Sequence, residues 1–400
     1  MVAWMALIGI EDPRPARPPA GFALFALGFR PFYLLAGALA ALSVPAWAAQ
    51  FAGWLPAGSY PADALWHAHE MLFGYAFAVI TGFLFTAVRN WAGRPTPTGP
   101  ALAATAALWL SARLLVLSPW PVLSAAADTL FAIAVALGIA RPLIASGNRR
   151  NYFFIVLVLG LGAANLAFHA ALAGWLQFDA KRALSVGFDL VMFIMAVVAG
   201  RVVPAFTNAA RQGAGARRIG AIEHAALGLV LALLACDLAG LAEAAAAIAF
   251  AAALAHAARV ALWAPLRVLG NPLLWILHLS YAWIAVHLAL RGAAGFGWVA
   301  PNLAMHALSI GAIGGLTLGM MTRTSRGHTA RPLVAGRSET ACYVLVHLAA
   351  AVRVFLPLAA PGAYLYSVGA SATLWSAAFA LFTVAYWPIL SHPRLDGQPG

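Results

Sequence analysis

The chain alternates between long apolar runs and short gaps that carry most of its charge. A helix needs roughly 20 mostly apolar residues to cross a bilayer. Twelve runs reach or approach that length, and they leave no room for a soluble domain. We therefore predict an all-α polytopic membrane protein with a single transmembrane domain over residues 1–400, a short segment 1–30 and a tail 391–400. The predicted spans are 32–53, 65–88, 101–117, 122–141, 152–173, 184–207, 221–240, 244–263, 271–290, 300–321, 339–357 and 366–389.

One boundary between spans is less distinct than the others. The chain is apolar almost throughout the seventh and eighth spans, and Gly240 and Glu243 mark the turn predicted between them. Glycine favours such a turn because it tolerates backbone conformations that other residues avoid.

Composition removes the main alternatives to a membrane protein. The chain is 63% hydrophobic and 9% charged, whereas about a quarter of the residues in a soluble domain are charged. This excludes both a water-soluble fold and a disordered chain. Its two cysteines stand alone in apolar runs, so zinc-ribbon sites, iron–sulfur clusters and covalently attached haem are not expected.

The basic residues indicate how the helices are oriented. Eighteen of them fall in gaps on one side of the predicted membrane, and three, Lys181, Arg182 and Arg291, fall on the other. Positively charged loops stay in the cytoplasm, so we expect both termini to be cytoplasmic. The net charge of +12 then reflects topology and predicts no nucleic-acid partner. Arg113, Arg201 and Arg353 lie within spans.

Histidine is the residue that most suggests chemistry. Of eleven histidines, His67, His69, His169, His287 and His306 are predicted in the outer half of the membrane. Imidazole binds haem iron and copper without adding charge, so a buried metal site is expected. We select as cofactor ligands His67, His69, His169, His278 and His306, with His287 and His347 as further metal ligands. The alternative is that these side chains only hydrogen-bond neighbouring helices.

The segment 65–74 concentrates these signals. Residues two apart on a helix point about 200° apart, so His67 and His69 are expected to serve two different centres. His67 is expected to share its face with Glu70 and Met71. Glu70 could support an imidazole or relay protons; the alternative is an ion pair with an interior arginine such as Arg353.

Two further features lie in the predicted spans. Asp189 stands in the outer part of the sixth span, and we select it with Glu70 as a candidate catalytic carboxylate. Gly311, Gly315 and Gly319 recur every four residues in the tenth span. This spacing predicts a strip of close contact between two helices.

Several blocks together resemble the NnrS family of bacterial membrane proteins over nearly the whole chain. They are Gly-Phe-Arg-Pro-Phe at 28–32, Leu-Trp-His-Ala-His-Glu-Met-Leu-Phe-Gly at 65–74, and the stretches 82–93, 200–207 and 306–329. One departure is Arg89, where a proline is expected before Asn-Trp. The resemblance implies a role in nitric oxide metabolism or tolerance, and it implies non-covalent haem b and copper as cofactors. It also implies a multi-pass protein of the bacterial inner membrane.

We therefore expect a haem protein, with copper, that acts on nitric oxide or protects against it and possesses a buried histidine-ligated centre. Reduction of nitric oxide would need protons and electrons, the latter from a quinol or another donor. Glu70, Asp189 and His328 are candidates for these contacts. Two alternatives stay open, namely a secondary transporter of a small solute and a non-catalytic sensor of nitric oxide or haem.

Overall fold

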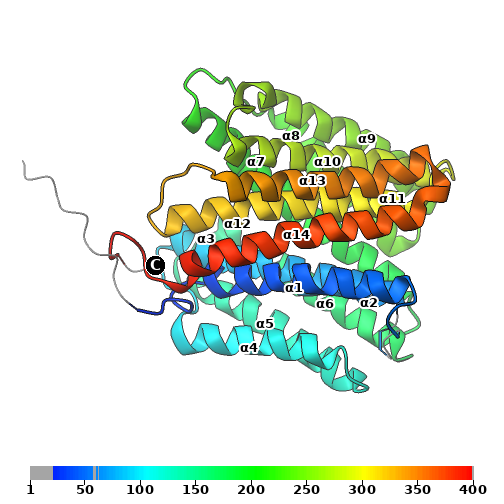
Figure 1. Cartoon of the computed structure of the whole chain (residues 1–400), viewed down its shortest axis with the longest axis horizontal. Helices are drawn as coiled ribbons and strands as arrows, with labels where there is room; N and C mark the ends of the chain where they lie inside the picture. The colour runs from blue at the N-terminus through cyan, green and yellow to red at the C-terminus, as the bar shows by residue number, and fades with distance from the viewer. Residues whose placement is uncertain (1–20, 57–59, 62, 399–400) are drawn as a thin grey trace, which may run out of the picture.

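The structure is a computed structural model that describes residues 21–56, 60–61 and 63–398. Within these ranges it contains helices and no strands, and the helices lie side by side along the long axis of the molecule (Figure 1). The longer helices are α1 (Phe29–Phe51), α3 (Phe77–Ala92), α4 (Gly99–Leu115), α5 (Pro121–Ala145), α6 (Phe153–Leu172), α7 (Ala180–Ala210), α8 (Gly220–Ala239), α9 (Ala242–Leu262), α10 (Pro272–Gly295), α12 (Gly315–His328), α13 (Arg337–Ala359) and α14 (Tyr364–Ser391).

Two of the spans are composite. The second consists of α2 (Asp63–His69), a π-helical segment η1 (Glu70–Ala76) and α3. The tenth consists of α11 (Pro301–His306), a π-helical segment η4 (Ala307–Gly314) and α12. Short 3₁₀ turns complete the chain at η2 (Arg149–Asn151), η3 (Pro265–Val268) and η5 (Pro361–Ala363).

The predicted all-α membrane fold is confirmed. Each of the twelve predicted spans coincides with a helix, and eleven of these are long and apolar enough to cross a bilayer, whereas Gly99–Leu115 is a shorter apolar helix. The indistinct boundary is also placed correctly, because α8 ends at Ala239 and Gly240 adopts a φ of +74° before α9 begins. Of the predicted segment 1–30, residues 1–20 lie outside the described residues.

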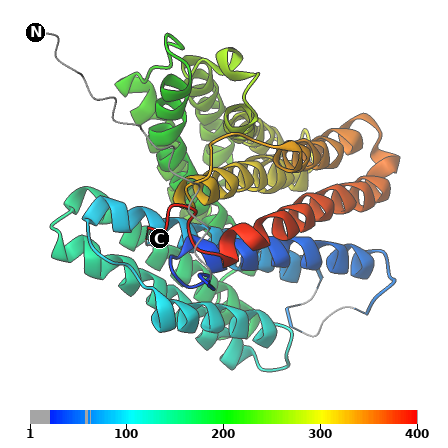
Figure 2. The ribbon, with the colours of Figure 1, turned by 60° about the vertical axis from the view of Figure 1, so that its left-hand side comes forward.

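The bundle is elongated in cross-section. Helices α4 and α5 lie at one end and α8 and α9 at the other, with α1, α12, α13 and α14 between them (Figure 1). Many neighbours in sequence are also neighbours in space, including α5 with α6, α9 with α10 and α13 with α14. The first and last long helices, α1 and α14, also pack together along the bundle (Figure 2). We call the half that the charge bias places outside the cytoplasm the outer half.

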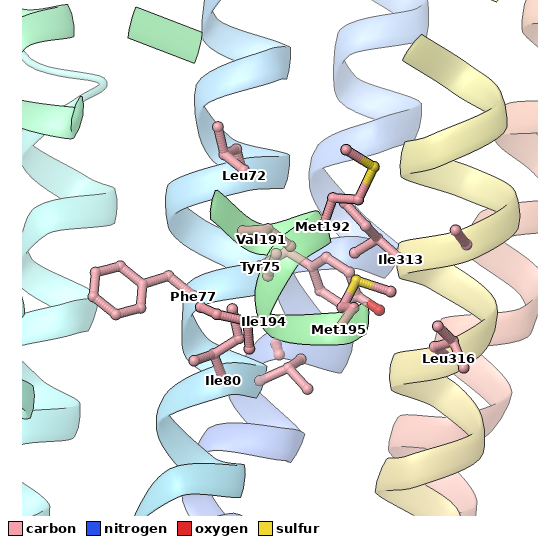
Figure 3. Packing of buried hydrophobic residues seen from close by; sticks show 14 of the residues in the cluster. Leu72, Tyr75, Phe77, Ile80, Val191, Met192, Ile194, Met195, Ile313 and Leu316 are labelled. Atoms are coloured by element: carbon pink, nitrogen blue, oxygen red, sulfur yellow. The ribbon is translucent and has the colours of Figure 1, made fainter. Parts of the chain in front are cut away.

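The centre of the bundle is apolar. Leu72 and Tyr75 from η1, Met192 from α7 and Ile313 from η4 approach one another there (Figure 3). A small cavity of about 70 Å³ lies beside them, and most of its walls are aliphatic and methionine side chains. Because apolar side chains gain little by leaving lipid, close packing of this kind is what holds membrane helices together.

The predicted glycine strip is a helix contact. A Cβ atom added at Gly311, Gly315 or Gly319 would meet side chains of α10, including Trp283 and Ser280. The small residues therefore allow η4 and α12 to approach α10 closely, which is the role the four-residue spacing predicts.

Candidate metal centre

Three buried side chains from three different helices converge in the outer half. Among the described residues, His69, Asp128 and His169 form the group whose ligand atoms lie within 4.8 Å of one another. His69 ends α2, Asp128 lies in the first half of α5, and His169 lies in the last turn of α6. All three are at most 2% exposed. Ionisable groups at this depth are costly and usually functional.

The spacing of these atoms suits a metal ion. The Oδ2 atom of Asp128 lies 3.1 Å from Nε2 of His169 and 3.4 Å from Nε2 of His69. Ligands at about 2.0–2.1 Å from a tetrahedral ion are roughly 3.3 Å apart. The two imidazoles and the carboxylate could therefore bind one ion with little rearrangement.

A second set of groups fixes each of these side chains. Nδ1 of His69 lies 3.0 Å from Oε1 of Glu70, and Nδ1 of His169 lies 3.0 Å from the hydroxyl of Tyr60. Arg113 donates to Oδ1 of Asp128, which leaves Oδ2 to face the histidines. Metal-binding histidines commonly have their second nitrogen held in this way. Burial and the nearby Asp128 charge raise the pKa of Tyr60 to about 12, so its phenol stays protonated.

The carboxylates and the arginine at this centre do not sum to zero charge. Arg113 pairs with Glu70 at 2.7 Å and also with Asp128, so two carboxylates face one guanidinium. With neutral histidines the cluster has a net negative charge in a low-dielectric setting. A bound cation, or a proton on His69, compensates that charge. The Oδ1 atom of Asn165, 2.9 Å from Nε2 of His69, adds a further polar contact.

The two π-helical segments begin beside candidate ligands. The last residue before η1 is His69, and the last residue before η4 is His306. A π-helix widens the turn and shifts the residues that follow it to new faces, and such segments are frequent at functional sites. The sequence gives no simple signal for them, because η1 and η4 continue apolar helical runs.

A second candidate site lies on the other side of α2. A cavity of about 330 Å³, here called the His67 cavity, is enclosed by α1, α2, η1, α7, α11, η4, α13 and α14. The His67 ring stacks on Trp47 with 4.2 Å between ring centroids, and no described residue hydrogen-bonds to either of its nitrogens. His306 also lines the cavity, and its Nδ1 lies 2.6 Å from the carbonyl oxygen of Asn302. In the neutral ring this leaves Nε2 with a lone pair.

The structure places His67 and His69 in different sites, as the helical repeat predicted. Two details of the sequence interpretation were wrong. Glu70 does not line the cavity with His67, because it turns towards His69. Its arginine partner is Arg113 and not Arg353, which donates instead to the hydroxyl of Tyr364 at 2.8 Å.

The other selected residues lie away from the His69 cluster. Both ring nitrogens of His278 have hydrogen-bond partners within the protein. His347 accepts a bond from the Trp283 indole at 3.2 Å. His287 and Asp189 line another cavity, between α7 and α10. The tertiary structure thus joins only two of the selected histidines, His69 and His169, around a single carboxylate.

Sequence reasoning missed the carboxylate at the centre of this cluster. Asp128 is an acidic residue within the predicted span 122–141, and this is the same signal that singled out Glu70 and Asp189. Tyr60 offered no comparable signal, because it lies in the connection between two spans and reaches His169 only through the fold.

The fold and this cluster define a polytopic all-α membrane protein with a buried group of histidines and a carboxylate suited to a metal ion. Comparison with curated proteins found no match to the chain. A family model described as NnrS protein matches residues 23–394, so the chain belongs to the NnrS family. This is a family of membrane proteins related to nitric oxide and associated with metal and haem binding.

Proposed function

We propose that the chain is a haem- and copper-containing protein of the bacterial inner membrane that acts on nitric oxide at buried, histidine-ligated centres. The observation that carries the proposal is the convergence of His69, Asp128 and His169, each held by a further polar group. A histidine that only joins two helices needs no such arrangement.

The first centre is proposed to bind copper. His69 and His169 would supply imidazole nitrogens and Asp128 a carboxylate oxygen, a donor set that suits divalent copper better than a soft thioether site would. When bound, the ion would supply one-electron redox chemistry. The protein holds the donors in place: Glu70 fixes the ring of His69, Tyr60 that of His169, and Arg113 the carboxylate of Asp128. We therefore propose Glu70 as a positioning residue.

The second centre is proposed to bind haem in the His67 cavity. Its volume of about 330 Å³ lies in the range of cofactor pockets, and its walls include Trp47 and Trp375. His67 and His306 present nitrogens without partners among the described residues, and they would hold the haem iron. Arg353 also lines the cavity and would suit the propionates.

Nitric oxide suits a site of this kind. It is small, neutral and soluble in lipid, so it can reach a buried centre without a polar channel. Reduction of two molecules to nitrous oxide and water consumes two electrons and two protons. We propose a lipid-soluble quinol as the electron donor, because the protein lies in the lipid bilayer in which such a molecule dissolves.

The first test is an absorption spectrum of the detergent-purified protein, oxidised, reduced and reduced with nitric oxide, together with metal analysis of the same sample. We expect iron and copper, and a Soret band that shifts when nitric oxide is added. A colourless, metal-free protein after growth with haem and copper would overturn the proposal and favour a transporter. Bound haem without consumption of nitric oxide would favour a sensor.

Variants then separate the two centres. We expect His67→Ala and His306→Ala to lose the Soret band and keep copper, and His169→Ala to lose copper and keep the band. His224→Ala is the matched control, because that histidine is exposed and lines neither centre. Equal haem and copper in all four proteins would show that both ligand assignments are wrong.

A further inference from the structure

A third buried polar site lies in the outer half, between α7, α8, α9, α10 and α11. Its cavity, here called the Asp189 cavity, measures about 280 Å³. Most of its lining is small or apolar, as with Ala245, Ala246 and Leu308, and its polar groups gather around Asp189, His287 and Arg291. The proposed centres do not use these residues.

Two buried atoms in this cavity lack hydrogen-bond partners among the described residues. His287 donates from Nδ1 to the carbonyl oxygen of Ala304 at 2.8 Å, so in the neutral ring Nε2 is an acceptor without a donor. Asp189 accepts from Arg291 through Oδ1 at 2.7 Å, and its Oδ2 has no donor. Both residues are at most 2% exposed. Buried acceptors are almost always paired in native proteins.

The protein's own nearby cation cannot serve both of these atoms. Arg291 already binds Asp189 through one amino group and Asp237 through the other, at 2.7 and 2.6 Å. Two carboxyl groups sharing one guanidinium leave the site without spare positive charge, which opposes an anionic ligand and favours a donor of hydrogen bonds. A ligand with two O–H or N–H groups would therefore satisfy both acceptors.

The lining and volume of the cavity narrow the choice of ligand further. Asp189, Asp237 and His287 are not among the described groups whose ligand atoms converge closely enough for a metal ion. Water could satisfy the acceptors, but one water takes up only about 30 Å³, and most of this cavity is walled by groups that cannot bind water. An apolar body with two hydroxyls would occupy the space and supply both donors.

We propose that the Asp189 cavity binds the headgroup of a lipid-soluble hydroquinone, with His287 Nε2 and Asp189 Oδ2 accepting hydrogen bonds from its two hydroxyls. This inference rests on the proposed function, because nitric oxide is the oxidant that takes up the electrons of the hydroquinone. Oxidation of the hydroquinone to quinone breaks two O–H bonds and releases two protons and two electrons. Conversion of two nitric oxide molecules to nitrous oxide and water consumes that number of each, so no other co-reactant is needed.

The position of the cavity supports delivery of electrons to the proposed haem. Phe188 and Met305 line both the Asp189 cavity and the His67 cavity. The two spaces are therefore separated by no more than a layer of side chains. Ala242, Gly295 and Pro301 at the rim are exposed at helix ends, where a ligand can enter.

The test is photoaffinity labelling of the full-length purified protein with an azido-substituted benzoquinone, with decylubiquinol as competitor. We expect labelled peptides from 242–246 or 301–308, protected by the competitor. Asp189→Asn and His287→Gln should each lower competitor affinity roughly tenfold, as expected for one lost hydrogen bond. Glu243→Gln and His224→Gln are exposed, matched controls. Label elsewhere, or unchanged affinity in both site variants, would overturn the proposal.

A second measurement separates this inference from the proposed function. Nitric oxide loss is followed with decylubiquinol and, in parallel, with ascorbate and a dye that bypasses the quinol. Turnover with the dye but no specific labelling would overturn the hydroquinone site and leave the proposed function intact. Competed labelling without turnover from either donor would support the site and contradict nitric oxide reduction. If a site variant fails to elute as a monodisperse protein, the other variant carries the test.

Discussion

The histidines of the outer half differ from those of the inner half in what their ring nitrogens contact. In the inner half, His256 contacts the hydroxyl of Tyr281 at 2.8 Å and the carbonyl oxygen of Ala226 at 3.3 Å. His278 likewise uses both ring nitrogens. In the outer half, neither nitrogen of His67 has a described partner. His69 and His169, also in the outer half, face the carboxylates of Glu70 and Asp128. The comparison teaches that burial alone does not distinguish these histidines: the two inner ones meet neutral partners, whereas the outer ones meet a carboxylate or keep an unused nitrogen.

The buried arginines show the same contrast in charge. In the inner half, Glu223 receives bonds from both Arg259 and Arg218, so its carboxylate is fully compensated. In the outer half, Arg113 alone faces Glu70 and Asp128. The inner carboxylate has two guanidinium partners, whereas the outer cluster has one guanidinium for two carboxylates. Each prediction below tests this contrast.

The largest effect is expected from removal of the outer arginine. Arg113→Met would leave two carboxylates buried without their cation, at a cost of about 3–5 kcal/mol. Thermal unfolding in detergent should show this loss. Arg218→Met is the control, because its half-exposed side chain belongs to a pair worth about 1 kcal/mol or less. Equal unfolding temperatures for the two variants would contradict the contrast.

Loss of a proposed ligand should remove the metal and keep the fold. We expect Asp128→Asn to weaken copper binding by roughly 100-fold or more, because second-layer changes alone cost 10–100-fold. Copper retained after dialysis against a chelator is the measurement. His256→Gln, in the inner half, should retain the wild-type amount of copper. A copper content that falls in both variants would point to general destabilisation.

The residues that hold the ligands should have smaller effects. Tyr60→Phe removes the hydroxyl beside His169 Nδ1, and Glu70→Gln removes the negative charge of the acceptor beside His69 Nδ1. Each should weaken copper binding about 10-fold. Competition with a chelator of known affinity measures this directly. Tyr364→Phe serves as a control for the loss of a phenol, since that hydroxyl contacts Arg353 and Asn302 and not the cluster. Wild-type affinity in Glu70→Gln would exclude its positioning role.

The smallest effect is expected at His278 in the inner half, because both of its ring nitrogens already have hydrogen-bond partners within the protein. His278→Gln should cost about 1 kcal/mol, since an amide can replace only part of the imidazole's bonding. The Soret band and the copper content should stay at their wild-type values. A loss of either cofactor would restore His278 to the ligand set and break the distinction between the two halves.

The sequence predicted most of the fold because membrane spans are encoded locally. Each span depends on the apolarity of about 20 consecutive residues, and all twelve coincide with helices. The turn at Gly240 was also visible, since it needs a residue that tolerates positive φ. The four-residue repeat from Gly311 to Gly319 predicted a contact surface correctly.

The site was only partly predictable. The sequence indicated that His67 and His69 face different directions, because that follows from the helical repeat alone. It did not indicate that Asp128 joins His69 and His169, or that Arg113 is the partner of Glu70. These contacts involve α2, α4, α5 and α6, and the rotation of one helix against another is not encoded in either run.

By itself, then, the sequence determined the number of spans, their approximate limits and the approximate depth of each polar side chain, because these depend on local hydrophobicity and a fixed rise per residue. Only the tertiary structure decided which polar groups meet and which nitrogens stay unused. The physical reason is that helix rotation in lipid is set by close packing between helices. In this chain the π-helical segments after His69 and His306 add a local shift that regular helical periodicity does not contain.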